Sequence, residues 1–84
     1  MLTSLALMSL YKSPTIPLAE VCERYFALSY EEAAKKASRN ELPVPAFRLT
    51  TSRKAPLMVS AEALGSWIDK TEQQAKDLWE RSQV

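Results

Sequence analysis

The sequence predicts a single small domain that is mainly α-helical and contains one short β-hairpin. Three observations support this fold class. Four segments carry apolar residues at the three- and four-residue spacing of amphipathic helices. Two short runs between the third and fourth segments alternate in polarity, as strands do. The chain of 84 residues has one glycine and five prolines, which is too little glycine for a flexible linker. A chain of this length buries one modest core.

The first two helices are expected at residues 2–11 and about 18–27. Apolar side chains recur every three residues in the first segment, and Pro14 follows it as a stop. Residues 15–17 then form a short extended link, because a residue that precedes proline is disfavoured in the helical region. The apolar face of the second helix includes Cys22, which we interpret as a small buried hydrophobic residue.

A third helix is expected from Tyr30 to about Asn40. Ser29 and Glu32 form the S-x-x-E pattern of a capping box, which marks a helix start. The inward face of this helix is mostly alanine, so it can pack closely on its neighbour. Two helices joined by a turn of about three residues, the second with a narrow alanine face and a basic outer face, are typical of a helix-turn-helix.

Two short strands are expected at residues 46–49 and 57–59. Their alternation places Phe47 and Leu49 toward the core and Arg48 toward solvent. Together with the preceding helices, this hairpin predicts a winged helix-turn-helix domain.

The polar loop between the two strands, residues 50–55, carries Arg53 and Lys54 at its tip. Such a loop is either the solvated turn of an ordinary hairpin or a basic wing that contacts a phosphate backbone. The loop sequence alone leaves both interpretations open.

A fourth helix is expected from a Ser60 cap to about Arg81. Gly65 weakens it by about 1 kcal/mol relative to alanine. Small and apolar residues then follow a heptad-like spacing. This seam is a candidate oligomerisation surface, and a helix that folds back on its own domain explains the spacing nearly as well. We divide the chain into a winged helix-turn-helix domain, 1–69, and a C-terminal helical extension, 70–84. The seam residues are Leu64, Ile68, Thr71, Ala75, Leu78 and Trp79.

The distribution of charge is more informative than the total of +1. Residues 33–54 hold six basic residues and one acidic residue, a net charge of +5, and the rest of the chain carries −4. A basic centre between acidic ends is either a solvated face or a surface for a polyanion, and we favour double-stranded DNA. Arginine and asparagine suit base edges, and lysine suits phosphates. The candidate DNA-binding residues are Ser29, Lys35, Lys36, Ser38, Arg39, Asn40, Arg48, Arg53 and Lys54.

Missing residue types disfavour several classes of function. The chain has no histidine and one cysteine, which excludes an intramolecular disulfide, a zinc site of cysteine and histidine ligands, and a histidine-based catalytic triad. We therefore expect no enzyme activity, no metal and no cofactor. The apolar stretches are too short to span a bilayer, so no membrane partner is expected. A lone thiol favours a cytoplasmic location.

The sequence contains five short runs that share a pattern with known proteins: Y-F-A-L-S at 25–29, A-K-K-A at 34–37, E-L-P-V-P-A-F-R-L at 41–49, K-A-P at 54–56 and W-I-D at 67–69. Together they resemble the pyocin activator protein family, PrtN-like, over about residues 2–70. The resemblance implies a small bacterial or prophage activator of bacteriocin genes. It also implies a helix-turn-helix shape related to excisionases and MerR-type winged regulators.

Three functions follow as hypotheses. The first is a sequence-specific DNA-binding transcriptional activator, with the helix at about 29–40 in the major groove and the wing at about 46–59 on the backbone. It would act as a homo-oligomer, because one small module binds weakly, and RNA polymerase would be a further partner. The second is an excisionase-like architectural protein that bends DNA. The third is an adaptor that binds a protein partner and has no DNA activity.

Overall fold

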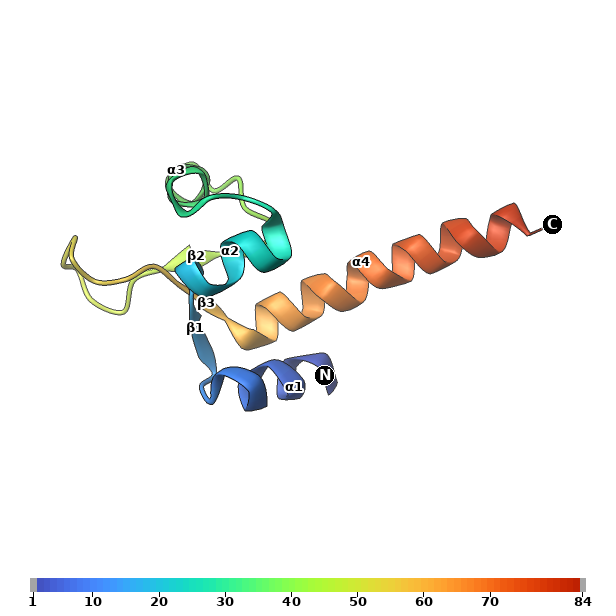
Figure 1. The fold of residues 1–84 in the computed structure, drawn as a ribbon, viewed down its shortest axis with the longest axis horizontal. Helices are drawn as coiled ribbons and strands as arrows, with labels where there is room; N and C mark the ends of the chain where they lie inside the picture. Colours follow the sequence, from blue (N-terminus) through green and yellow to red (C-terminus); the bar gives the residue numbers. More distant parts are fainter. Residues whose placement is uncertain (1, 84) are drawn as a thin grey trace.

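A computed structural model describes residues 2–83 and confirms a mainly helical fold with a small antiparallel sheet (Figure 1). All four predicted helices are present, and the described part of the chain measures 54 × 27 × 17 Å. The helices are α1 (Leu2–Tyr11), α2 (Leu18–Phe26), α3 (Tyr30–Ser38) and α4 (Ala61–Ser82), and the strands are β1 (Thr15–Pro17), β2 (Ala46–Phe47) and β3 (Met58–Ser60).

The sheet has three strands instead of the two of the predicted hairpin. β3 lies in the centre and pairs antiparallel with both β1 and β2, so that Ile16 lies opposite Val59. The extended link at 15–17 is therefore a strand, and its Pro17 is tolerated because β1 is at the sheet edge. β2 ends at Phe47. The expectation that Leu49 faces the core is wrong, because Leu49 follows the strand and is 69% exposed.

The core lies between the sheet, α2 and the first turns of α4. The Cys22 side chain is buried in it, which confirms its interpretation as a small hydrophobic residue. At the edge of the core, the rings of Phe26 and Trp67 meet edge to face with centroids 5.1 Å apart, a favourable aromatic geometry. The largest side chains with no exposed surface are Ile16, Leu18, Val21, Val59 and Leu64.

α1 lies along the first half of α4, and two small residues bring the helices close together. A Cβ atom placed on Gly65 would lie 2.8 Å from the Ser4 backbone nitrogen, closer than real Cβ atoms come. The Ser4 hydroxyl donates a hydrogen bond to the Glu62 carbonyl at 3.4 Å, and the Thr3 hydroxyl donates to the Asp69 carboxylate. Gly65 is therefore a packing residue, a role that helix propensity alone does not reveal.

α1 and α2 are linked through two tyrosines. The Tyr11 and Tyr25 side chains are neighbours, and both pack against the core. Burial raises the pKa of the Tyr25 phenol above its ordinary value, and Tyr11 raises that pKa further. The Tyr25 phenol therefore stays neutral at physiological pH and acts as a packing group.

Three helices end at a residue in the left-handed conformation that is not glycine. Lys12, Ala27 and Asn40 have φ values of 57°, 55° and 56°. After each of them, the next residue donates its backbone N–H to a carbonyl five or six positions earlier, as Glu41 does to Lys36 at 2.8 Å. Glycine is the usual residue at such helix ends, but the one glycine of this chain serves the contact between α1 and α4.

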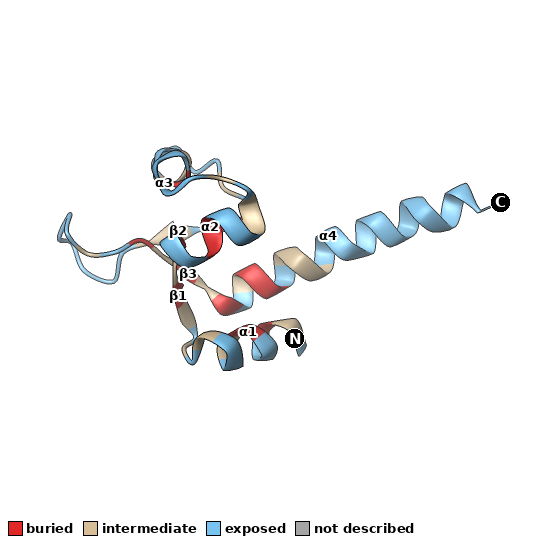
Figure 2. Ribbon diagram, viewed as in Figure 1, coloured by how far each residue is buried: buried red, intermediate tan, exposed pale blue. Residues whose placement is uncertain are grey.

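α4 consists of a packed half and a projecting half. Its first residues contact α1 and the core, whereas the side chains from Lys70 to Ser82 are all exposed (Figure 2). The alternative in which this helix folds back on its domain is therefore wrong for the projecting half. Leu64 belongs to the core and Ile68 is partly buried, so the exposed part of the seam begins at Thr71.

Candidate nucleic-acid interface

The predicted basic elements lie at the end of the molecule opposite to the C-terminus of α4 (Figure 1). They are α3 and the loop that joins β2 to β3, residues 48–57, which we call the wing loop. α3 follows α2 after a short turn and packs on it. Ser29 begins α3, because its hydroxyl oxygen accepts a hydrogen bond from the Glu32 backbone N–H at 3.3 Å. This confirms the predicted helix start.

α3 has an alanine face toward the fold and a charged face toward solvent, with Glu31 and Glu32 in its first turn and Lys35 and Lys36 in its last turn. Ala33 is fully buried, whereas Lys35 is exposed and Lys36 is half-buried. The Ser38 hydroxyl donates to the Lys35 carbonyl at 2.7 Å, so its hydrogen is occupied within the helix. Lys35 is therefore the most open cation of the helix itself.

The expectation that α3 reaches Asn40 is wrong by two residues. The helix ends at Ser38, and Arg39 and Asn40 form the turn after it, because Asn40 adopts the left-handed conformation. The Arg39 guanidinium lies 3.8 Å from the Glu41 carboxylate, with 71% and 50% of the two side chains exposed. A pair this exposed is weak, so Arg39 remains available to another partner.

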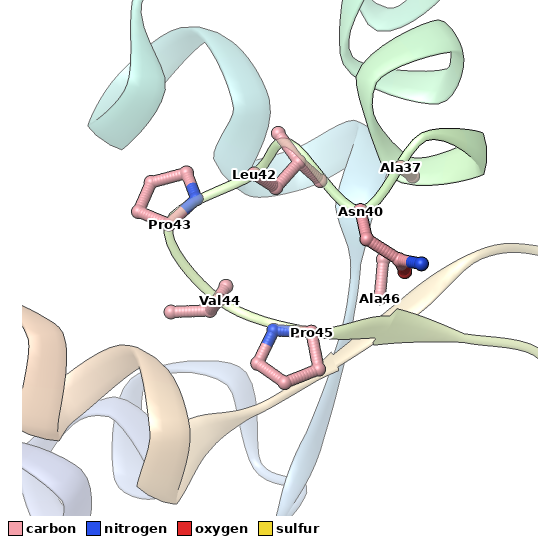
Figure 3. Close-up of a pocket in the computed structure, with 7 residues that line it drawn as sticks. All are labelled: Ala37, Asn40, Leu42, Pro43, Val44, Pro45 and Ala46. Carbon is pink, nitrogen blue, oxygen red and sulfur yellow. The ribbon is translucent and has the colours of Figure 1, made fainter.

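The L-P-V-P segment after this turn has alternating burial. Leu42 and Val44 pack toward the core, whereas Pro43 and Pro45 are exposed. Figure 3 shows the segment as an arc between the end of α3 and β2, with the Asn40 side chain on the side of Ala46. The arc encloses a pocket of about 290 Å³. The segment thus connects the end of α3 to β2 and is anchored to the core at Leu42 and Val44.

Arg48 has a structural part in the wing loop that the sequence did not reveal. Its Nε donates a hydrogen bond to the Ala55 carbonyl at 3.0 Å, across the base of the loop. Nearer the tip, the Ser52 hydroxyl oxygen accepts a hydrogen bond from the Lys54 backbone N–H at 3.1 Å. These bonds shape the loop that presents the exposed side chains of Arg53 and Lys54.

An open groove of about 520 Å³ runs between α3 and the wing loop. Its walls are mostly small or hydroxyl-bearing, with the Arg48 side chain as the one charged group. No acidic residue occurs between Glu41 and Glu62. The groove residues are Ala34, Ala37, Ser38, Ala46, Phe47, Arg48, Thr50, Thr51 and Leu57.

The fold brings the lysines of α3 and the basic tip of the wing loop to one end of the molecule. Within residues 2–83, Lys35, Lys36, Arg53 and Lys54 form no ion pair with a carboxylate. A charge that is already paired with a carboxylate attracts an anionic ligand only weakly. These four side chains have no such partner among the described residues and can therefore bind an anion. The same described residues hold no cluster of three side chains that could bind a metal ion, and no helix long and apolar enough to cross a membrane.

The fold and this surface define a small, mainly helical protein that exposes several basic side chains at one end. The chain matches the family described as Pyocin activator protein PrtN over residues 3–75, which is most of its length. It belongs to that family, whose description assigns a regulatory activator role. The match extends about five residues beyond the predicted resemblance, into the projecting half of α4. Comparisons with curated proteins and with solved structures found no match.

Proposed function

We propose that the protein is a DNA-binding transcriptional activator that inserts α3 into the major groove and rests the wing loop on the adjacent backbone. The observation that carries this proposal is the groove between α3 and the wing loop, whose lining includes Arg48 and no acidic residue. Sequence-independent affinity for DNA comes mainly from neutralised phosphates. An unpaired basic surface on a protein of an activator family fits that requirement.

The groove suits one sugar-phosphate strand. When a helix lies in the major groove and a wing reaches the next groove, a backbone strand must pass between them. Alanine side chains let the strand approach α3 closely, and the hydroxyls of Thr50 and Thr51 are donors of the kind that bind phosphate oxygens. The free guanidinium nitrogens of Arg48 add a positive charge beside them.

In this proposal, the exposed side chains at the C-terminal end of α3 contact the edges of the bases. Arg39 has the planar, bidentate donor group that pairs best with guanine in the major groove. Lys35 and Lys36 suit phosphates or guanine edges, and Arg53 and Lys54 suit phosphates only, because they lie at the tip of the wing loop. An activator also needs a contact with RNA polymerase, which we infer to be its second partner.

Selection of duplexes from a random pool, followed by anisotropy titrations, tests this proposal. The protein should enrich one recurring sequence, and Lys54→Ala should weaken binding to all duplexes. Lys76→Ala is the matched control, since Lys76 is an exposed lysine on the projecting half of α4. Failure to bind any duplex at low salt would overturn the proposal and favour the protein adaptor. Strong bending in a circular-permutation assay without reporter activation would favour the architectural alternative.

A further inference from the structure

The ion pair at the end of α3 joins two residues with opposite effects on a nearby polyanion. Arg39 carries the side chain best suited to guanine, and Glu41 is the one acidic residue between Glu32 and Glu62 in the sequence. The Arg39 guanidinium lies 3.8 Å from the Glu41 carboxylate. The most basic part of the chain thus contains one acidic residue, and it lies beside this arginine.

The turn after α3 holds the Glu41 backbone in this place. Asn40 has a φ of 56°, and this left-handed residue turns the chain at the end of the helix. The Glu41 backbone N–H donates a hydrogen bond to the Lys36 carbonyl at 2.8 Å, and the next residue, Leu42, packs against the core. The backbone is therefore anchored on both sides of Glu41, and only its side chain is free to move.

Stability does not account for an acidic residue at this position. The helix dipole favours acids at the start of a helix and cations near its end. It therefore explains Glu31 and Glu32, in the first turn of α3, but not Glu41. The ion pair with Arg39 contributes little, because 71% and 50% of the two side chains are exposed.

The two kinds of acceptor that DNA offers respond differently to such a pair. A phosphate is an anion, so it attracts a free arginine and is repelled by a carboxylate next to that arginine. The guanine edge is neutral and accepts two hydrogen bonds, whereas a guanidinium has five N–H donors. Arg39 can therefore bind guanine without losing Glu41, but a phosphate on Arg39 would lie beside a second anion.

We propose that Glu41 is a specificity-determining residue, which prevents Arg39 from strengthening non-specific binding and leaves it free to contact guanine. This inference rests on the proposed DNA binding and deepens it. Specificity is a difference between two affinities, so a residue that weakens the unwanted complex raises specificity as a new contact to the wanted site does. Non-specific binding comes from neutralised phosphates, and Glu41 opposes that contribution.

Glu41→Gln tests the inference, because glutamine keeps the size of the side chain and removes its charge. We expect the variant to bind an unrelated duplex about threefold to fivefold more tightly, and the selected duplex within about twofold of the parent. The base that Arg39 prefers should stay the same. Glu32→Gln is the matched control. Glu32 is an exposed acidic residue of α3 that forms no ion pair within residues 2–83, so its loss should change both affinities by the same factor.

The same titrations in an Arg39→Ala background show whether Glu41 acts through Arg39. In that background, Glu41→Gln should no longer favour the unrelated duplex. Circular dichroism checks that each variant folds. A selective tightening that persists without Arg39, or a tightening that is equal on both duplexes, would show that Glu41 acts only through the general charge of the surface and would overturn the inference. A parent protein that binds no duplex would overturn the proposed function together with this inference.

Discussion

Ser4 and Gly65 are in contact where α1 lies against α4, and the backbone of Ser4 occupies the space that a side chain at position 65 would need. Propensity predicts that alanine at position 65 would stabilise the helix by about 1 kcal/mol. The contact with Ser4 predicts instead that alanine at position 65 destabilises the protein. One substitution therefore distinguishes the effect of helix propensity from the effect of packing.

Gly65→Ala should lower the free energy of unfolding by about 1–3 kcal/mol, because the added methyl group must displace the backbone of α1. Thermal or urea denaturation measures the change. Ser66→Ala, on the exposed neighbouring position, should change stability by less than about 0.5 kcal/mol. A more stable Gly65→Ala variant would show that α1 does not pack as described.

Ala27→Gly should stabilise the protein by about 1 kcal/mol. Ala27 ends α2 with φ of 55°, where a side chain is strained and glycine is not. The same change at Ala19, an exposed position in the first turn of α2, should destabilise the protein by up to about 1 kcal/mol. Opposite signs for the same chemical change in one helix would verify the helix end, and equal losses would contradict it.

Arg48→Ala should loosen the wing loop, because it removes the hydrogen bond to the Ala55 carbonyl. A net hydrogen bond of about 1 kcal/mol corresponds to roughly fivefold faster opening. Limited trypsin digestion after Arg53 and Lys54 measures this opening. Thr50→Ala, a neighbouring loop change without a described hydrogen bond, should leave the cleavage rate near that of the parent. An unchanged rate in Arg48→Ala would assign Arg48 to the ligand alone.

Arg39→Ala should weaken binding to the preferred duplex by about 1–3 kcal/mol and relax the sequence preference at one base pair. Competition titrations with single-base variants of that duplex provide the measurement. Glu41→Gln, which removes the partner of Arg39, should leave the preference intact. If Arg39→Ala weakened binding equally on every sequence, Arg39 would be a phosphate contact.

Local patterns predicted the helices and their starts well. The Ser29 and Ser60 caps, the periodic apolar faces and the buried Cys22 all follow from short-range chemistry. The helix ends were less accurate, since Asn40 ends α3 through a left-handed turn that leaves no glycine signal in the sequence.

Long-range contacts were missed. The pairing of β1 with β3 joins segments more than forty residues apart in the sequence. Residues 15–17 contain no pattern that identifies β3 as their partner. The hydrogen bond of Arg48 across the wing loop and the contact of Gly65 with Ser4 depend likewise on the folded chain. For the site, the sequence predicted which segments carry the basic residues. The groove between α3 and the wing loop could not be predicted, because its lining residues come together only in the folded chain.

The central claim is that the unpaired basic end binds DNA, and its most direct test is the affinity for one selected duplex as a function of salt. Neutralised phosphates release counterions, so the log–log slope should be near −0.9 for each phosphate contacted. We expect a steep line whose slope falls by about 1 in Lys54→Ala and not in Lys76→Ala. A flat line, or equal slopes in all three proteins, would contradict the account and leave the basic end as a solvated surface.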